Sequence, residues 1–252
     1  MHCSSKQKSN TARFSEEIQK EGQNDPDYGQ DIIPKACGIA RDFITKDMRK
    51  FLDVGCGPGY FGKMIKDMQE AYVVGIEFTK KVTEHARKRL DEVHEVDAEY
   101  FDLPYEKQYF DCIAYFDVLE HMIDPWRLLK KHRPFLRNDG AVIASIPNIR
   151  NLGTLSEVIN DGRWSYRKEG GILDATHLRF FTWLTINELF QEAGYKIVAT
   201  GVTTISLYTK WLELGKPKVI DLGTMNIRLD EDGPVDFFVA QFVIKAEKTT
   251  PD

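Results

Sequence analysis

The sequence predicts an α/β protein with a Rossmann-like, mostly parallel sheet that is covered by helices on both faces. Two observations carry this prediction. Between residues 51 and 147, short apolar runs of strand length alternate with segments of helical periodicity, which is typical of right-handed βαβ units. The first run leads directly into a glycine-rich turn, GCGPG, as expected where a strand meets a helix that binds a ligand at its N-terminus.

The predicted elements follow one another from residue 32 onwards. Apolar residues recur at helical spacing from Ile32 to Phe43 and predict an amphipathic helix before the first strand. Strands are expected at 51–54, 72–76, 93–97, 110–116, 141–146 and 195–200, with a closing strand at 236–244. Helices are expected at 60–68, 79–90, from about 125 onwards and at 185–193.

Three segments depart from this alternation. Residues 1–31 are polar and predict a flexible N-terminal leader or lid, which leaves residues 32–252 as a single domain. Residues 148–182 are rich in aromatic and arginine side chains, and a connection of this length predicts a substrate-binding insertion that acts as a lid. A second irregular stretch is expected at 201–233.

The composition excludes several classes of protein. Of the 252 residues 42% are hydrophobic, which suffices for a full core, and 34 basic against 39 acidic residues give a net charge of -5. That balance argues against a nucleic-acid partner. No apolar run approaches the roughly 20 residues that cross a bilayer, and the N-terminus has no apolar segment of a secretory signal, so a cytoplasmic protein without a membrane span is expected. The four cysteines form no CxxC pair, which predicts buried thiols.

Acidic residues at the ends of successive predicted strands favour one type of cofactor. The letters from Gly57 satisfy GxGxxG, the dinucleotide fingerprint, but Asp53 precedes the turn and would repel a pyrophosphate. Its carboxylate would attract a cofactor that carries an amino group and a sulfonium, unless it merely caps the turn. Glu77 ends the second strand, where an acid accepts hydrogen bonds from ribose hydroxyls, although an ordinary solvated acid is the alternative. Asp97-Ala98 ends the third strand and suits an adenine amino group.

Several stretches together resemble the motifs of class I S-adenosylmethionine-dependent methyltransferases. They are FLDVGCGPG, VVGIEF, VDAEYFDLPYEKQYFDCIAYFDVLEH and LRNDGAVIASIPN. The helix TINELFQEAGY and the closing strand are also similar to this family. The resemblance implies a seven-stranded sheet that ends in an antiparallel strand, with the inserted lid after the fifth strand, and S-adenosylmethionine as the cofactor, which leaves as S-adenosylhomocysteine.

The resemblance also implies which residues hold the cofactor. The glycine turn would surround the methionine part, Glu77 would hold the ribose, and residues after the second and third strands would border the adenine. The segment after the fourth strand would line the side of methyl transfer. The cofactor-binding residues implied in this way are Asp53, Gly55, Cys56, Gly57, Gly59, Glu77, Phe78, Asp97, Ala98, Asp117 and Val118.

Two histidines are candidates for the acceptor side. His121 lies just past the fourth strand and could accept the proton of a hydroxyl or position the acceptor, because an imidazole titrates near neutral pH. The alternative is a structural histidine that caps the following helix. His177 lies in DATHLRFF, which resembles the D-x-T-H-x-R-F-F stretch of bacterial methyltransferases found beside glycosyltransferases. That subgroup implies a small hydroxylated acceptor, often a sugar.

Further residues are candidates for contacts with such an acceptor. Aromatic rings and guanidinium groups suit a sugar or an anionic handle, although the aromatics could instead form the core of a lid. The residues expected to contact it are Tyr28, Asn148, Asp174 and Arg179. No residues with metal-ligand spacing accompany them, so metal-independent chemistry is expected.

The sequence therefore predicts an enzyme that moves a methyl group from S-adenosylmethionine to a hydroxyl of a small molecule. A sugar, a nucleotide sugar or a glycan intermediate is the favoured acceptor. Two alternatives remain open at this point: transfer to the nitrogen of an amino sugar or small amine, and a partner subunit that binds the cofactor without turnover.

Overall fold

The computed structural model describes residues 34–168, 170–229 and 235–250, and the chain divides into two compact units. The larger unit comprises Asp31–Pro147, Thr176–Thr203 and Gln241–Asp252. The smaller unit contains the described residues of Asn148–Ala175 and Thr204–Ala240. The predicted leader at 1–31, with Tyr28, lies outside the described residues.

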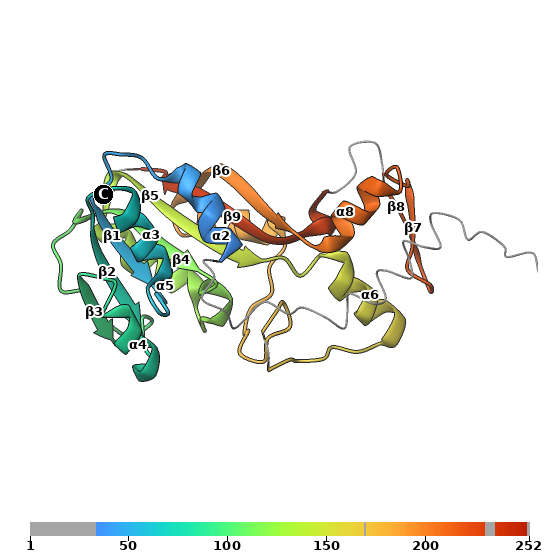
Figure 1. Cartoon of the computed structure of the whole chain (residues 1–252), viewed down its shortest axis with the longest axis horizontal. Coiled ribbons are helices and arrows are strands. Elements are labelled where there is room, and N and C mark those ends of the chain that lie inside the picture. Colours follow the sequence, from blue (N-terminus) through green and yellow to red (C-terminus); the bar gives the residue numbers. More distant parts are fainter. Residues whose placement is uncertain (1–33, 169, 230–234, 251–252) are drawn as a thin grey trace, which may run out of the picture. The chain divides into compact units, whose positions relative to one another are not determined.

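A seven-stranded sheet forms the centre of the fold (Figure 1). Its strand order is β3-β2-β1-β4-β5-β9-β6, in which β1 to β5 pair in parallel and β9 runs antiparallel to β5. The seven-stranded, mostly parallel sheet is therefore confirmed. The strands are β1 (Lys50–Val54), β2 (Tyr72–Glu77), β3 (Glu92–Glu95), β4 (Phe110–Phe116), β5 (Leu136–Pro147), β6 (Tyr195–Thr204) and β9 (Val239–Lys248).

Apolar side chains on both faces of the strands explain why helices cover the sheet. On one face Phe51, Val73 and Cys112 belong to a buried cluster with residues of α2 (Lys35–Ala40), α3 (Tyr60–Met68) and α4 (Lys80–Ala86). On the other face Tyr115 is buried, and its hydroxyl lies 2.9 Å from Nδ1 of His132 at the end of α5 (Pro125–His132). Cys112 and Tyr115, three positions apart on β4, thus point to opposite faces of the sheet, as the alternation of side chains along a strand requires.

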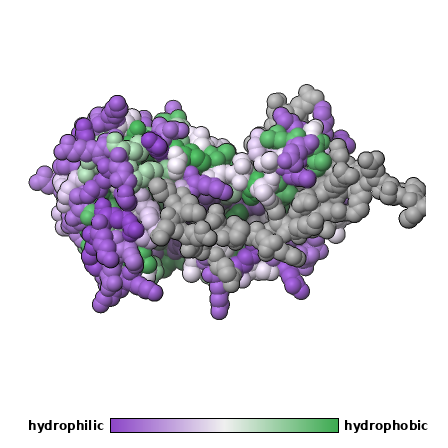
Figure 2. Space-filling view, in the orientation of Figure 1, coloured by the Kyte–Doolittle hydropathy of each residue, from purple (hydrophilic) through white to green (hydrophobic). Residues whose placement is uncertain are grey.

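The remaining described elements of the larger unit are short turns and one further helix. The helix α7 (Trp183–Glu192) begins with a capping box, in which Thr182 accepts a hydrogen bond from the Thr185 amide at 3.4 Å. Three short 3-10 helices lie at η1 (Arg41–Phe43), η2 (Leu119–His121) and η3 (Arg133–Phe135). Figure 2 shows mainly hydrophilic side chains over β3 and α4, in keeping with the polar sequence of β3.

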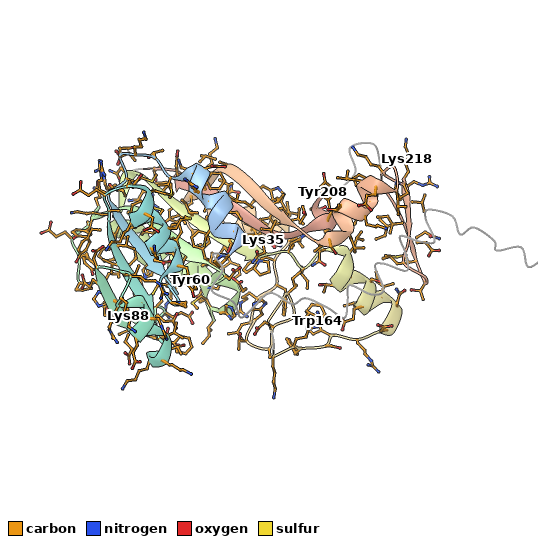
Figure 3. The ribbon with its side chains drawn as sticks, viewed as in Figure 1. Lys35, Tyr60, Lys88, Trp164, Tyr208 and Lys218 are labelled. Carbon is orange, nitrogen blue, oxygen red and sulfur yellow. The ribbon has the colours of Figure 1, made fainter. Side chains whose placement is uncertain are left out.

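The smaller unit has a hydrophobic core of its own. Its elements are α6 (Leu152–Asp161), α8 (Ser206–Glu213), β7 (Val219–Asp221), β8 (Asn226–Arg228) and η4 (Val235–Phe238). The buried residues of this hydrophobic core are Leu152, Leu207, Ile220, Leu222, Leu229, Phe237 and Phe238. Tyr208, labelled on α8 in Figure 3, packs its ring 5.7 Å from that of Phe238, measured between ring centroids.

Two stretches that depart from the predicted alternation contain helices or strands, and two predicted bounds were wrong. The insertion at 148–182 contains α6, whose N-cap Asn151 accepts a hydrogen bond from the Thr154 amide at 3.0 Å, and the stretch at 201–233 contains α8, β7 and β8. The strands β7 and β8 have 3 residues each, so their periodicity is weak in the sequence. The closing strand begins at Val239, because residues 235–238 form η4, and the helix predicted at 79–90 ends at Ala86.

None of the helices within the described ranges combines the length and the apolar character that crossing a membrane demands.

Candidate functional site

Asp53 near the end of β1 is a buried carboxyl group whose charged form a nearby cation would stabilise. It is 2% exposed, its carboxylate accepts a hydrogen bond from the Gly62 amide, and its Oδ2 atom has no hydrogen-bond partner among the described residues. Burial, together with the nearby Glu77 carboxylate, raises the pKa of Asp53 to about 8. A positively charged ligand would offset this cost, so Asp53 fits the amino group or sulfonium that the sequence predicts beside it.

The turn after β1 has the backbone that a closely approaching ligand needs. Gly55 has φ +66°, and a Cβ atom there would lie 2.5 Å from Cγ2 of Val118, so the turn and the segment after β4 touch at this point. Gly57 has φ +52°, and no described heavy atom lies within 4 Å of where its Cβ would be. Gly59, also with positive φ, is the N-cap of α3. The turn thus leaves open space at Gly57, two residues before the N-cap of α3.

Neighbouring residues hold the turn in place. The Cys56 amide donates to the Ile76 carbonyl at 3.0 Å, and Arg89 donates to the Pro58 carbonyl at 3.0 Å while its guanidinium lies over the ring of Tyr60, which Figure 3 labels at the start of α3. The thiol of Cys56 is buried, which raises its pKa above the usual range. Cys56 therefore presents no reactive thiolate at this turn.

Glu77 at the end of β2 connects two turns. Its Oε2 accepts a hydrogen bond from the Gly57 amide at 3.2 Å, and its Oε1 accepts one from the Thr79 amide at 2.9 Å. Each carboxylate oxygen retains a further acceptor position, which is the capacity that ribose hydroxyls would use. Phe78 follows immediately and is 77% exposed, so an apolar ring is presented to solvent beside Glu77.

The end of β3 is less strongly marked. Asp97 is exposed, and its Oδ1 accepts a hydrogen bond from the Glu99 amide at 2.9 Å, which holds the turn at that point. Ala98 is buried with 9% exposure.

We name the residues Asp53, Gly55, Gly57, Gly59 and Glu77 the cofactor edge.

Asp117 directly after β4 adopts an unusual backbone conformation. It has φ +53°, and its amide donates to Ser145 Oγ at 3.0 Å, while its Oδ1 accepts from Gln241 Nε2 at 2.5 Å. Burial raises the pKa of Asp117 to about 6, against the opposing effect of these hydrogen bonds. Strained backbone of this kind persists where the surroundings hold it and is common at functional sites.

Three side chains that could accept a proton or bind a metal ion lie close together just after Asp117 in the fold. Glu120 and His121 lie in η2, and His177 belongs to the segment that precedes α7. The imidazole rings of His121 and His177 meet edge to face at a centroid distance of 4.6 Å, and His177 Nε2 lies 4.0 Å from Glu120 Oε1. Glu120 is 1% exposed and His177 8%, whereas His121 is partly exposed. We name these three residues the histidine cluster.

Backbone hydrogen bonds fasten the two halves of the histidine cluster together. The amides of Leu178 and Arg179 both donate to the Glu120 carbonyl, at 2.8 Å and 2.9 Å. Arg179 also donates from its guanidinium to the Ile123 carbonyl. His121 Nδ1 lies 3.2 Å from the carbonyl oxygen of Thr176 and 3.0 Å from its hydroxyl.

These contacts bear on the alternative that His121 caps the next helix. The N-cap of α5 is Asp124, whose Oδ1 accepts from the Arg127 amide at 2.9 Å. His121 instead contacts Thr176, which directly precedes His177 in the sequence. The structure therefore brings the two histidine rings together, and their roles in a site stay a prediction.

The other predicted acceptor residues are placed differently. Asn148 is fully buried in the smaller unit, where its amide donates to the Asp236 and Val239 carbonyls and its Oδ1 accepts from the Arg150 amide. Its contacts thus stabilise that unit. Asp174 also belongs to the smaller unit, where its amide donates to the Gly171 carbonyl at 3.1 Å. Among the aromatics of the insertion, Phe181 is buried, whereas Trp164 and Tyr166 are exposed.

Sequence reasoning missed Glu120 and Gln241 as parts of the site. Glu120 had a local signal, since it directly precedes His121, but its burial against His177 depends on tertiary structure. Gln241 lies on β9, 124 residues from the Asp117 that it contacts, and nothing in its sequence neighbourhood marks it.

Comparison with known proteins supports the picture drawn from the geometry. The model of the family described as "Methyltransferase domain" matches residues 6–200. A probable S-adenosylmethionine-dependent methyltransferase of Mycobacterium tuberculosis is 29% identical over 100 residues, which are 40% of this chain and 36% of that protein. The 27-O-demethylrifamycin SV methyltransferase of Amycolatopsis mediterranei is 30% identical over 97 residues, 36% of either chain. These matches span little more than a third of the relatives' own length.

Solved structures agree with the fold. A crystal structure of a methyltransferase dependent on the same cofactor, from Archaeoglobus fulgidus, aligns with a TM-score of 0.60 at 19% identity and covers 85% of this chain and 93% of that chain. A possible histamine N-methyltransferase from Thermotoga maritima aligns with a TM-score of 0.57 at 19% identity, over 85% of this chain and 87% of that chain. At such identities the likeness concerns the fold alone.

Proposed function

The chain belongs to the methyltransferase-domain family of class I S-adenosylmethionine-dependent proteins, and on that basis we propose that it transfers a methyl group to a hydroxyl of a small molecule. A sugar, a nucleotide sugar or a glycan intermediate is the acceptor we favour. The observation that carries the choice of a hydroxyl is the pair of adjoining imidazoles at the end of β4, His121 and His177.

The cofactor edge has the donor and acceptor groups that S-adenosylmethionine requires. Asp53 would face the positively charged methionine part, Glu77 would accept hydrogen bonds from the ribose, and the open backbone at Gly57 would allow close approach. Phe78 would lie against the adenine, and Asp97 and Ala98 would border it. The cofactor supplies a methyl group bonded to a sulfonium, whose departure as a neutral thioether needs no further activation.

The histidine cluster would serve the acceptor. A hydroxyl must lose its proton as its oxygen attacks, and an imidazole close to that oxygen can hold or accept the proton. The contact between His121 Nδ1 and the Thr176 carbonyl favours the tautomer in which Nδ1 carries hydrogen and Nε2 carries the lone pair. His121 is partly exposed, so its ring is accessible to an acceptor.

Two further points support a hydroxylated acceptor with an anionic or polar handle. Arg179 is fixed near the histidine cluster by its backbone and by the Ile123 carbonyl, and its guanidinium retains donors that could bind a carboxylate or phosphate. The name of the relative from Amycolatopsis mediterranei describes methylation at an oxygen.

The test is incubation of the protein with isotopically labelled S-adenosylmethionine and fractionated cell metabolites, followed by mass spectrometry. Label in a carbohydrate fraction that is lost in the His121→Ala and His177→Ala variants supports the proposal. Label found only in amines would move the reaction to nitrogen, which needs less help from a base. Tight cofactor binding without label in any fraction would replace the proposal by a non-catalytic cofactor-binding partner.

A further inference from the structure

We propose that Glu120, His121 and His177 bind one divalent transition-metal ion, such as Zn²⁺, Co²⁺ or Mn²⁺. One ligand atom from each residue lies within 4.8 Å of the others. Two imidazoles and one carboxylate on a single centre are the donor set of several three-ligand metal sites that keep positions open for water or substrate. The proposal goes beyond the proposed function and replaces the metal-independent chemistry that the sequence spacing predicts.

Burial favours a counter-charge at this position. Glu120 is 1% exposed, and the burial of an ionised carboxylate favours positive charge beside it. His177, only 8% exposed, presents Nε2 towards the same carboxylate at 4.0 Å. A distance of this size is too long for a direct hydrogen bond but leaves room for an ion to contact both atoms after a small adjustment, because metal–ligand bonds measure about 2 Å.

Contacts behind the ligands hold their orientation. A metal-binding histidine commonly donates its second ring N–H to a carbonyl or carboxylate, which leaves the other nitrogen for the metal. His121 makes this contact to the carbonyl of Thr176, 55 residues further along the chain. The amides of Leu178 and Arg179, which donate to the Glu120 carbonyl, keep His177 over η2. The three ligands are thus held together without any metal.

The donor set also indicates which ions would bind. Imidazole nitrogens favour Zn²⁺, Co²⁺ and related ions, whereas Mg²⁺ prefers oxygen ligands only. His121 is partly exposed, so an ion could enter and water or an acceptor oxygen could fill the remaining positions. A hydroxyl bound there would lose its proton to solvent water at a lower pH than a free hydroxyl does.

The experiment is a metal titration of the full chain without a histidine tag, after chelation and dialysis. Zn²⁺ and Mg²⁺ serve as probes in calorimetry, with metal content measured by mass spectrometry. We expect one Zn²⁺ per chain, weaker binding of Mg²⁺, and an affinity for Zn²⁺ that falls by at least about 10–100-fold in Glu120→Gln and in His177→Gln. The matched control is His85→Gln, which alters an exposed histidine on α4 and should bind Zn²⁺ as the unaltered chain does.

A spectroscopic measurement covers the case in which the variants fail to fold, which circular dichroism would reveal. Electron spin-echo modulation of the Cu²⁺-loaded, unaltered chain should then show two coordinated imidazoles. Absence of stoichiometric metal, equal affinity in Glu120→Gln and the unaltered chain, or a spectrum without imidazole nitrogen would overturn the proposal. None of these measurements uses the cofactor or an acceptor, so their failure is distinguishable from failure of the methyl-transfer proposal.

Discussion

The cofactor edge and the histidine cluster both lie beyond the carboxyl ends of parallel strands, but they are built in different ways. The cofactor edge rests on backbone groups: the Gly57 amide meets Glu77, and positive φ angles shape the turn after β1. The histidine cluster rests on side chains from distant segments, held by the two amides that donate to the Glu120 carbonyl. The shape of the first region depends mainly on local backbone conformation, and the second depends on side chains that tertiary structure brings together.

Because the two regions are built differently, we expect substitutions in one region to impair a different property from substitutions in the other. A change in the cofactor edge should weaken cofactor binding and alter stability, because Asp53 and Gly55 are buried or tightly packed. A change in the histidine cluster should lower the rate of transfer and leave cofactor binding intact. Four predictions test this separation, in order of decreasing expected effect.

The His177→Ala variant should lose most of its transfer activity. Removing a group that handles the acceptor's proton, or that holds an ion doing so, lowers the rate by about 10²–10⁴-fold. The affinity for S-adenosylmethionine should stay within about twofold of the unaltered chain's, because His177 lies outside the cofactor edge. Single-turnover transfer and calorimetric binding measure the two quantities, with the exposed His85→Ala as the control. An equal loss of cofactor affinity would contradict the expectation that the two regions act independently.

The Asp53→Asn variant should stabilise the cofactor-free protein, and more so as the pH rises. Burial raises the pKa of Asp53 to about 8 from an ordinary value of 3.8, so between these pH values the native state holds a proton that the unfolded state releases. The stability of the unaltered chain therefore falls as pH rises through this window, whereas asparagine has no proton to lose and can still accept from the Gly62 amide.

Between pH 5 and pH 8 the advantage of Asp53→Asn should grow by on the order of 2–4 kcal/mol in the free energy of unfolding. Urea unfolding at several pH values measures it. Cofactor affinity should fall in the same variant, since the charge that faces the methionine part is gone. A constant difference in stability across this pH range would contradict the prediction.

The Gly55→Ala variant should lose about 10–100-fold in cofactor affinity and about 1–3 kcal/mol in stability. Its new methyl group would lie 2.5 Å from Val118 Cγ2 and would occupy a backbone with φ +66°. Two variants separate these causes. Gly215→Ala, with φ +76° and open space, should cost only the backbone term, and Val118→Ala combined with Gly55→Ala should recover part of the affinity. No recovery in the double variant would mean that backbone strain alone is responsible.

The Thr176→Val variant should have the smallest effect. It removes the hydroxyl that lies 3.0 Å from His121 Nδ1 but keeps the carbonyl at 3.2 Å, so the orientation of the ring is only weakened. Loss of one such hydrogen bond corresponds to about a 2–10-fold slower transfer. Thr176→Ser should restore the rate, and steady-state kinetics distinguish a change in kcat from one in KM. A transfer rate unchanged by Thr176→Val would show that the carbonyl alone orients His121.

Elements with local signals could be predicted from the amino-acid sequence alone. Strands such as β1 and β4 are mainly apolar runs that end where predicted, and α3 spans Tyr60–Met68 as its periodicity indicates. The glycine turn and the acids near the ends of β1 and β2 could also be predicted, because the backbone turn needs glycine and the acids stand at characteristic distances from it. The membership of the family follows from the same local motifs.

Groups of residues from distant segments could not be predicted in this way, because tertiary packing brings them together. Gln241 reaches Asp117 across 124 residues, and His177 meets Glu120 because two amides fasten their segments together. The smaller unit likewise draws its core from residues on both sides of α7, which no sequence period connects. Periodicity reports which side of one element is buried, but the free energy of a contact between distant segments depends on the whole packed chain.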